Sequence, residues 1–268
     1  MHQSELGFQS EITPVILTFN EAPNIGRTLS MLTWATEVIV VDSGSDDGTL
    51  EILQAFLNVR VVHRRFDTHA QQWNFAVSQT GVKTPWVLAL DADYVLTPGL
   101  IVELSQLRPD PGVDSYQTRF RYCVFGRPLR GTLYPPVTTL FRAGVGRYVQ
   151  DGHTQRLHLS ARPVPLQEVI NHDDRKPLSR WLWAQDRYAS LEVAMLSSKP
   201  NSQLRLQDKL RKWMIVTPWL VPLHCLTIGK GVLDGWPGVY YALQRGVAES
   251  ILSLRLLERR LAELNRDH

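Results

Sequence analysis

The sequence predicts an α/β protein in which a mostly parallel sheet is followed by a helical appendage at the C-terminal end. Over the first hundred or so residues, short apolar segments rich in β-branched residues alternate with segments of helical periodicity, as in a parallel sheet with crossover helices. Polar or acidic residues follow these apolar segments, where the chain leaves the sheet. Beyond residue 174 the chain is basic and rich in tryptophan, and helical patterns replace the strands.

The composition limits the class of protein. A length of 268 residues and a hydrophobic content of 44% suffice for one large domain, or for a domain with an appendage. Cys123 and Cys225 lie far apart and lack metal-ligand spacing, so we expect no disulfide framework and a reducing compartment. Residues 1–11 are polar and lack the pattern of a signal peptide, so we expect a location on the cytoplasmic side.

The charge divides the chain into two parts. From Arg175 to the end there are 15 Lys and Arg against 8 Asp and Glu, whereas the part before has 14 against 18. A basic, tryptophan-rich tail is compatible with nucleic acid or with anionic lipid headgroups. Its amphipathic pattern favours lipid, and we expect no nucleic-acid partner.

The first predicted strand covers residues 13–18, a β-branched apolar run between polar segments. Asn24 is then expected to cap a helix that ends at about residue 34. A second strand at 37–41 is again almost wholly apolar and leads to Asp42. Strand, helix and strand in this order imply a right-handed parallel crossover.

The same alternation continues downstream. Residues 42–49 form a loop rich in turn formers, and Asp47 or Thr49 is expected to cap a helix that ends near residue 56. Three further elements are expected: a strand at 59–62, a helix at 69–79 and a strand at 86–90.

Asp91 and Asp93 follow the last of these strands. Two carboxylates at that edge suit a hard divalent cation such as Mg²⁺ or Mn²⁺, which is often shared with a substrate diphosphate. The alternative is that one Asp caps the following helix and the other is solvated. Since Asn20, Glu21 and Asp42 end the neighbouring strands, the sequence indicates a nucleotide pocket at this edge of the sheet.

Three motifs in this order carry a family resemblance: Thr18-Phe19-Asn20-Glu21, the run VVDSGSDDGT at 40–49, and Leu90-Asp91-Ala92-Asp93. The chain resembles glycosyltransferase family 2, the inverting, nucleotide-sugar-dependent enzymes of the Rossmann-like GT-A fold. It is most similar to the branch that includes the bacterial lipopolysaccharide core glycosyltransferases. Weaker matches at 140–142 and 233–238 extend the resemblance over most of the chain.

The resemblance implies a role for each polar group at the sheet edge. Asn20, Glu21 and Asp42 would contact the base and the ribose, Asp91 the ribose or the water shell of the metal, and Asp93 the Mg²⁺ or Mn²⁺ itself. Three further residues that lie in matching stretches are assigned to the nucleotide sugar: Phe19, Asn74 and Arg142.

The chain departs from the family pattern at two places. Family members often have Arg before the Asn of the third helix, whereas Trp73 precedes Asn74 here, so that phosphate contact comes from elsewhere or is absent. The related core transferases carry a His-Glu pair whose Glu is the expected base, and this chain has His153-Thr154. Because Thr cannot act as a general base near neutral pH, we assign that role to Asp151, with a turn or helix cap as the alternative.

Residues 111–174 are expected to form the acceptor half of the domain, after a nucleotide-binding half at 11–110. Aromatic and polar residues alternate from Val113, which predicts a half-exposed strand. Residues 126–136 are a candidate lid that is rich in turn formers. His172 either joins Asp93 on the metal or binds the diphosphate.

Residues 175–268 are predicted to be the helical appendage. Arg175 and Lys176 at its start are candidates to bind phosphates, and the alternative, which is compatible with this, is that Asp173 or Asp174 caps its first helix. A basic run at 209–212 precedes an apolar stretch at 213–228, which is shorter than the ~20 residues that a bilayer requires and is broken by two prolines. We expect this stretch on an anionic membrane surface, with a buried helical hairpin as the alternative. A leucine stripe at 240–264 is explained by packing against the tail or against a second subunit.

These features together predict an inverting transfer of one sugar from a nucleotide-diphosphate sugar to a glycolipid or cell-envelope polysaccharide acceptor. The enzyme would lie peripherally at the cytoplasmic face of the inner membrane. One rival is a sugar transferase to polyprenyl phosphate, which needs no base because its acceptor is already anionic. The other is a catalytically silent scaffold that only binds a nucleotide sugar.

Overall fold

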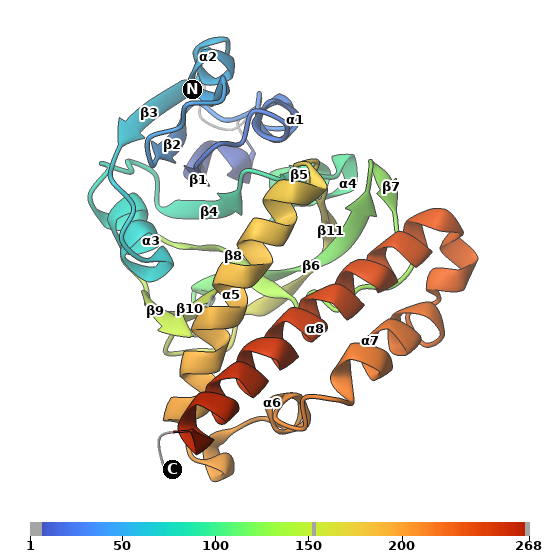
Figure 1. Cartoon of the computed structure of the whole chain (residues 1–268). Coiled ribbons are helices and arrows are strands. Elements are labelled where there is room, and N and C mark those ends of the chain that lie inside the picture. The colour runs from blue at the N-terminus through green and yellow to red at the C-terminus, as the bar shows by residue number, and fades with distance from the viewer. Residues whose placement is uncertain (1–6, 152–153, 266–268) are drawn as a thin grey trace, which may run out of the picture. The chain divides into compact units, whose positions relative to one another are not determined.

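The computed structural model describes residues 7–151 and 154–265 (Figure 1). The chain divides into two compact units. The sheet unit consists of Met1–Pro128, Tyr134–Gln150 and Gln155–Arg175, and the helical unit consists of Leu129–Leu133, Asp151–Thr154 and Lys176–His268. The helical unit therefore includes two short segments that precede the predicted boundary after residue 174.

The strands of the sheet unit confirm the predicted α/β class. Their bounds are β1 (Ile12–Thr18), β2 (Val38–Asp42), β3 (Val59–His63), β4 (Trp86–Asp91), β5 (Tyr94–Leu96), β6 (Ser115–Val124), β7 (Arg127–Pro128), β8 (Val137–Arg142) and β11 (Val164–His172). Among the described residues they form one nine-stranded sheet in the order β3-β2-β1-β4-β8-β6-β11-β5, with β7 paired to β6. The first four in this order are parallel, as is the pair β6 and β11, whereas β8, β5 and β7 run antiparallel to their neighbours. A separate two-stranded sheet joins β9 (Arg147–Asp151) to β10 (Thr154–His158).

The helices of this unit follow the predicted order but are shorter. They are the 3-10 turn η1 (Phe8–Glu11), α1 (Ile25–Ser30), α2 (Thr49–Gln54), α3 (His69–Ser78) and α4 (Pro98–Gln106). The prediction that the first helix reaches residue 34 is wrong. Asn58 donates hydrogen bonds to the carbonyls of Leu32 and Ala35, at 3.1 and 3.0 Å. These two carbonyl groups beyond the end of the helix therefore still have hydrogen-bond donors.

Threonines cap the two longer of these helices. Thr68 accepts from Gln71 N at the start of α3, and Thr97 accepts from Leu100 N at the start of α4. Since Thr97 occupies that position, neither Asp91 nor Asp93 caps α4, and that alternative is excluded.

Caps predicted at the other two helices differ from those observed. Gly48 precedes α2 with a φ of +92°, where Asp47 or Thr49 was expected. Asn24 stands at the start of α1 but makes no capping bond with its side chain. Its side-chain amide instead forms hydrogen bonds in the candidate active site, which are described below.

Both faces of the central strands β1, β2 and β4 are buried, which explains their uninterrupted apolar runs. Along β1 and β2, Ile16 and Val40 belong to one buried cluster together with residues of α1, α2 and α4. Val15 and Ile39 point to the other cluster, which contains residues of α3. The alternation predicted for β6 is confirmed as well, since its aromatic residues are buried or half-buried while Arg119 and Arg121 are exposed.

The helical unit consists mainly of α5 (Leu178–Ser198), the 3-10 turn η2 (Asn201–Gln203), α6 (Leu206–Arg211), α7 (Thr217–Leu226), the 3-10 turn η3 (Gly231–Asp234) and α8 (Trp236–Leu264) (Figure 1). Pro177 precedes α5, so the prediction that Asp173 or Asp174 caps it is wrong. A small core joins α5 to α8 through Ala189, Val193, Leu196 and Leu252. In the described part of the chain, no helix combines the length and the apolar character needed to cross a membrane.

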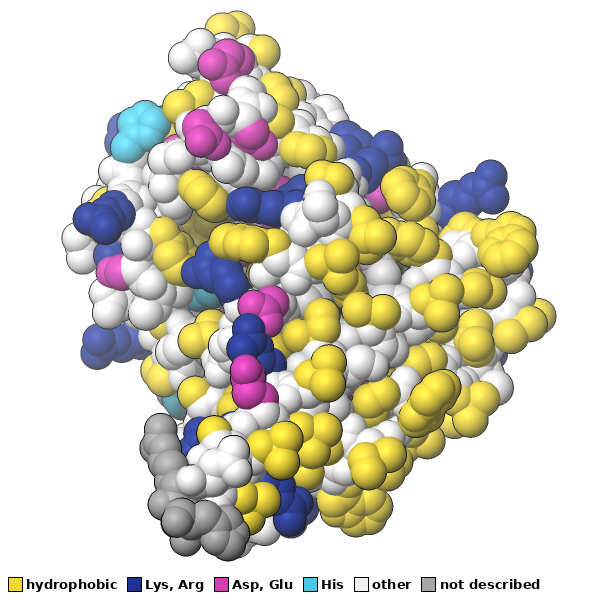
Figure 2. All heavy atoms as spheres, in the orientation of Figure 1, with side chains coloured by type: hydrophobic (Ala, Val, Ile, Leu, Met, Phe, Trp, Pro, Cys, Tyr) yellow, Lys and Arg dark blue, Asp and Glu magenta, His cyan; other side chains and the backbone are white. Residues whose placement is uncertain are grey.

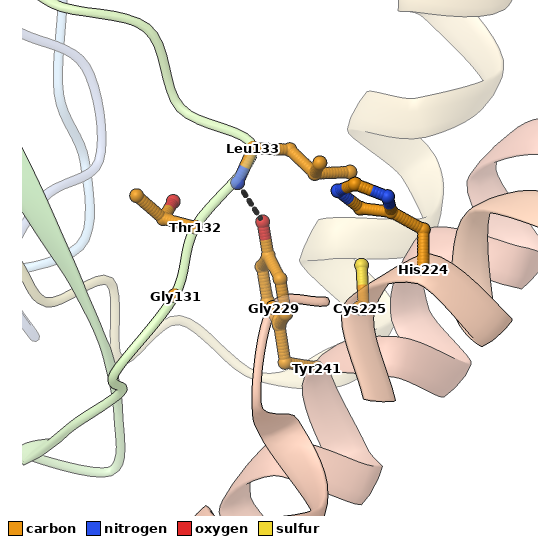
Figure 3. A pocket seen from close by; sticks show the side chains of 7 residues that line it. All are labelled: Gly131, Thr132, Leu133, His224, Cys225, Gly229 and Tyr241. Atoms are coloured by element: carbon orange, nitrogen blue, oxygen red, sulfur yellow. Dashed lines mark hydrogen bonds between the residues drawn. The ribbon is translucent and has the colours of Figure 1, made fainter. Parts of the chain in front are cut away.

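Residues 129–133, inside the predicted lid, are packed into this helical unit. Arg130 N donates to Asp234 Oδ2 at 3.0 Å, and Leu133 N donates to the Tyr241 hydroxyl at 3.1 Å (Figure 3). Gly131 lies so close to the backbone of Gly229 that a Cβ at this position would clash with it. These contacts hold the middle of the predicted lid in place.

Candidate active site

The carboxyl ends of β1, β2 and β4 meet at one edge of the sheet. Thr18 is in register with Asp42, and Leu17 is in register with Asp91. The structure thus brings together the ends of the strands that the sequence motifs follow. In an open α/β sheet this is the edge at which ligands bind.

Asp42 organises the loop that follows β2. Its side chain is fully buried. One carboxylate oxygen accepts from Thr18 Oγ1 at 3.1 Å and from Ser45 Oγ at 2.5 Å, and the other accepts from the backbone N–H groups of Gly44 and Ser45 at 2.9 and 3.0 Å. These bonds use the acceptor capacity of a carboxylate, so in this conformation Asp42 shapes the wall of the site.

Asn20 is bound to the same loop. It adopts a left-handed φ of +56°, which Asn tolerates better than most residues. Its side-chain amide exchanges two hydrogen bonds of 2.9 Å with Asp46, and its backbone N donates to Ser45 Oγ. The preceding Phe19 is 43% exposed and offers an apolar face beside these polar groups.

Asn24 joins the end of β1 to the end of β11. Its Nδ2 donates to both Glu21 Oε2 and Asp174 Oδ1 at 2.8 Å. Its Oδ1 accepts from Arg175 N at 2.9 Å and from Arg27 Nη2 at 3.0 Å. This fully buried amide therefore positions Glu21, one of the predicted donor contacts.

His172 lies against Asp93, as one of the two predictions for it requires. Its Nε2 is 3.1 Å from Asp93 Oδ2, because β11 and β5 pair with His172 opposite Tyr94. The rings of Tyr94, Tyr122 and Tyr134 surround the imidazole at centroid distances of 5.4, 5.0 and 4.7 Å. Burial lowers the pKa of His172, but nearby carboxylates, Asp93 foremost, raise it more, so its pKa lies above the ordinary value.

This pair fits a divalent cation that is shared with a substrate. The 3.1 Å separation is that of a hydrogen bond or ion pair, and the same two atoms are the ligand atoms that the pair would offer to a cation. Among the described residues no group of three or more His, Cys, Asp and Glu is placed to hold a metal, so the protein offers a carboxylate and an imidazole here. Mg²⁺ and Mn²⁺ are commonly bound by one or two protein ligands together with substrate phosphates. A mixed oxygen and nitrogen set suits Mn²⁺ better than Mg²⁺.

Sequence reasoning missed Arg27, which lies next to this pair. Arg27 Nη2 donates to the carbonyl of Asp173 at 2.7 Å, and its Nε is 3.4 Å from Asp173 Oδ2. Arg175 Nη2 reaches the same carboxylate oxygen at 2.8 Å. Burial lowers the pKa of Arg27, with Asp173 opposing that shift and Arg175 reinforcing it. An arginine keeps its charge in such surroundings, so two charged guanidinium groups lie together beside Asp173.

Two predicted donor residues are engaged elsewhere. The side chain of Asn74 exchanges hydrogen bonds of 2.9 Å with the backbone of Tyr148, and Trp73 stacks on the Tyr148 ring. Arg142 is in register with Trp86, at the start of β4, because β8 is antiparallel to β4. At ~3.3 Å per residue this is about 17 Å from Asp91, at the opposite edge of the sheet. We therefore leave Arg142 out of the site.

The predicted base remains a prediction. Asp151 is the last residue of β9, and its side chain lies outside the part of the structure that is described, as does the whole of His153.

A pocket inside the helical unit is not a substrate site. It is lined by Gly131, Thr132, Leu133, His224, Cys225, Gly229 and Tyr241 (Figure 3). Its volume of about 20 Å³ has room for a water molecule and not for a sugar.

Comparison with known proteins agrees with the motifs at the sheet edge. The family described as "Glycosyl transferase family 2" matches residues 13–148. The lipopolysaccharide core biosynthesis glycosyltransferase LpsC of Rhizobium meliloti is 30% identical over 100 residues, which is 36% of each chain. An uncharacterized glycosyltransferase of Rickettsia bellii is 36% identical over 107 residues, covering 40% of this chain and 35% of that protein. The chain thus matches only about a third of the length of these relatives.

Some solved structures are similar to this chain at low sequence identity. A complex of S. aureus TarS 1–349 with UDP-GlcNAc has a TM-score of 0.48 at 16% identity and covers 94% of this chain and 91% of that one. The glucosyl-3-phosphoglycerate synthase of Mycobacterium tuberculosis has a TM-score of 0.49 at 17% identity, over 73% of this chain and 82% of that one. Similarities at this level say nothing about the substrate.

Proposed function

The chain belongs to glycosyl transferase family 2, and from this premise we propose that it transfers a sugar from a nucleotide-diphosphate sugar to a glycolipid or cell-envelope polysaccharide, with inversion. The observation that carries the proposal is the sheet edge where the Asp93–His172 pair lies near the ends of β1 and β2. Charged and polar groups of both signs gather there. A nucleotide diphosphate needs both, acceptors for the nucleoside and cations for the phosphates.

In this proposal the donor lies along the edge. Phe19 packs on the base, and Glu21 and Asp91 accept hydrogen bonds from the base or the ribose. Asp42 does not contact the donor in this proposal but fixes the conformation of the loop after β2, which lines the site. Arg27 takes the place of the missing arginine before Asn74 and faces the diphosphate together with Arg175.

Asp93 and His172 would hold Mg²⁺ or Mn²⁺, which when bound neutralises the charge that develops on the departing diphosphate. Asp151 would remove the proton from the acceptor hydroxyl as it attacks the anomeric carbon. The acceptor class implies a place at the cytoplasmic face of the membrane, against an anionic lipid surface. Transfer to a polyprenyl phosphate remains the second candidate, because Thr154 replaces the glutamate that related enzymes use.

A thermal-shift screen of nucleotide sugars with and without Mn²⁺ tests the proposal. The true donor should raise the melting temperature, since a ligand at a hundred times its Kd stabilises the native state by ~2.7 kcal/mol. Mn²⁺ should strengthen this effect. Absence of stabilisation by any nucleotide or nucleotide sugar would contradict the donor site. Donor binding without transfer or hydrolysis would instead favour the silent scaffold.

A further inference from the structure

The helical unit carries an apolar surface that its own packing leaves uncovered. It lies between residues 213 and 236, along α7, η3 and the segments beside them. We call it the tryptophan surface, and it consists of the exposed residues Trp213, Ile215, Trp219, Leu220, Leu223, Ile228, Val232, Leu233 and Trp236. Figure 2 shows hydrophobic side chains crowded over the region of α7 and α8. Such contiguous exposed apolar area marks an interaction site.

The exposure follows from the way α7 packs. Its inner face contains the buried Thr217 and Cys225, and Pro222 lies against Gly246 of α8, where a Cβ would come within 2.7 Å of the proline ring. Trp219 and Leu223 are one helical turn apart on the other face. Among the described residues of the helical unit, Trp219 at 78% and Leu223 at 58% exposure leave that face largely uncovered, although the helix itself is well packed.

The two most exposed members of this surface are tryptophans. Trp219 and Trp236 are 78% and 84% exposed, and Trp213 is 63% exposed. Tryptophan combines an apolar ring with one N–H donor, and it concentrates at the boundary between lipid chains and headgroups. A protein partner would also accept such side chains, so the charge around them decides.

The charge beside the surface is positive. Residues 199–230 contain six Lys and Arg and one acidic residue, Asp208. Arg211 does not contribute to the outer charge, because it faces inward to Glu249 at 3.0 Å and Glu192 at 3.4 Å. Lys209 and Lys230 are exposed. Exposed cations beside an apolar surface complement an anionic lipid surface.

We propose that the tryptophan surface inserts into the headgroup region of an anionic lipid bilayer and thereby holds the helical unit on the membrane. Burial of apolar side chains supplies most of the affinity, and the lysines add the preference for anionic lipid. The inference deepens the proposed function and rests on it for the location of the acceptor at a membrane. Binding of the tryptophan surface to lipid does not depend on the proposed function.

A second exposed stripe provides a matched control. On α8, six apolar residues are exposed: Leu243, Val247, Leu254, Leu257, Leu261 and Leu264. Ile251, which completes their spacing of three and four residues, is half-buried and packs on the small core of α5 and α8. Most of the predicted stripe is therefore not packed against the tail. It is narrow, contains no tryptophan, and is flanked by Glu258 and Arg260, charges of opposite sign. A narrow seam of this kind suits another helix better than a bilayer.

The test is flotation of the full chain with vesicles of phosphatidylcholine alone or mixed with phosphatidylglycerol. Wild type should float with both and more strongly with the mixture, and high salt should remove that difference. The double variant Trp219→Ser, Trp236→Ser should bind at least about tenfold more weakly, while Leu254→Ser, Leu261→Ser should bind like wild type. Both variants should keep the melting temperature and the donor binding of wild type.

Several results would overturn the inference. These are no flotation of wild type, unchanged binding of the tryptophan variant, or equal loss in the leucine variant. If sedimentation instead shows that the tryptophan variant turns a dimer into a monomer and no vesicle binds, the surface covers a second copy of the chain. Donor binding is read separately, so its absence in wild type would contradict the proposed function and not the membrane surface.

Discussion

The sheet unit and the helical unit place charged and apolar side chains in opposite ways. In the sheet unit the apolar strands are buried on both faces, and Arg27, Asp173 and Arg175 gather next to the Asp93–His172 pair. In the helical unit Arg211 is drawn inward by carboxylates, while tryptophans and leucines face outward. The sheet unit thus gathers charged groups at the strand ends, and the helical unit exposes apolar side chains.

The two arginine clusters show why residue type alone does not reveal the role. Arg211 faces three carboxylates, from Glu192, Asp208 and Glu249, so its charge is fully offset within the unit. At the sheet edge Arg27 and Arg175 share the carboxylate of Asp173, and Asp93 and Asp174 also act on Arg27. Arg211 is enclosed by its carboxylates, whereas Arg27 and Arg175 lie at the strand ends where the proposed donor would bind.

The largest effect is expected from Asp93→Asn. The variant should lose Mn²⁺-enhanced nucleotide binding and transfer should fall by roughly 1,000-fold, because the amide cannot offset the charge of the cation. Calorimetric titration of nucleotide diphosphate with and without Mn²⁺, and single-turnover transfer, measure the two effects. Asp114→Asn, which removes a carboxylate near Arg142 at the opposite edge, should behave like wild type. Retention of metal-enhanced binding in Asp93→Asn would refute the assignment.

Arg211→Gln tests the cluster that Arg211 forms with Glu192, Asp208 and Glu249. It should destabilise the protein by about 3–5 kcal/mol, because Glu192 and Glu249 would remain buried without their counter-charge. Urea unfolding measures this loss. The control is Arg255→Gln, which breaks the exposed pairs with Asp186 and Glu258 and should hardly change stability. Similar behaviour of the two variants would mean that the Arg211 cluster is not structural.

Asp151→Asn tests the chemistry of the acceptor. If the acceptor is a hydroxyl, transfer should slow by about 100-fold while donor binding is retained, since the amide has nearly the same size but takes no proton. Single-turnover transfer with the true acceptor is the measurement, and Glu168→Gln is the matched carboxylate control. A loss confined to Glu168→Gln would show that the wrong acid was chosen. Unchanged rates in both would favour the polyprenyl phosphate.

The sequence predicted the donor half of the fold well because its strands are buried on both faces. Runs such as 37–41 and 86–90 leave little ambiguity, and the residues that follow them necessarily reach one edge when the strands are parallel. The direction of β8 was not predictable in this way. Its antiparallel pairing with β4 takes Arg142 to the wrong edge, although the local sequence matches the family.

Asn24 and Arg27 were missed for a different reason. Their partners lie about 150 residues further along the chain, at Asp173, Asp174 and Arg175. A local sequence pattern cannot predict a contact between residues so far apart in the chain. On α8 the amphipathic pattern predicted which residues share a stripe but not which stripe is buried. Tyr241, Ala242 and Leu252 are buried, and the leucine stripe stays outside.

The packing of residues 129–133 has a consequence for how the chain can be divided. A shorter protein ending at Arg175 would keep this segment but lose Asp234 and Tyr241, so the N–H groups of Arg130 and Leu133 would lose their acceptors. Such a truncation would damage a loop far from the cut, and the helical unit could not be transferred to another protein without that loop. The helical unit is therefore built from residues 129–133 as well as from the part of the chain after Arg175.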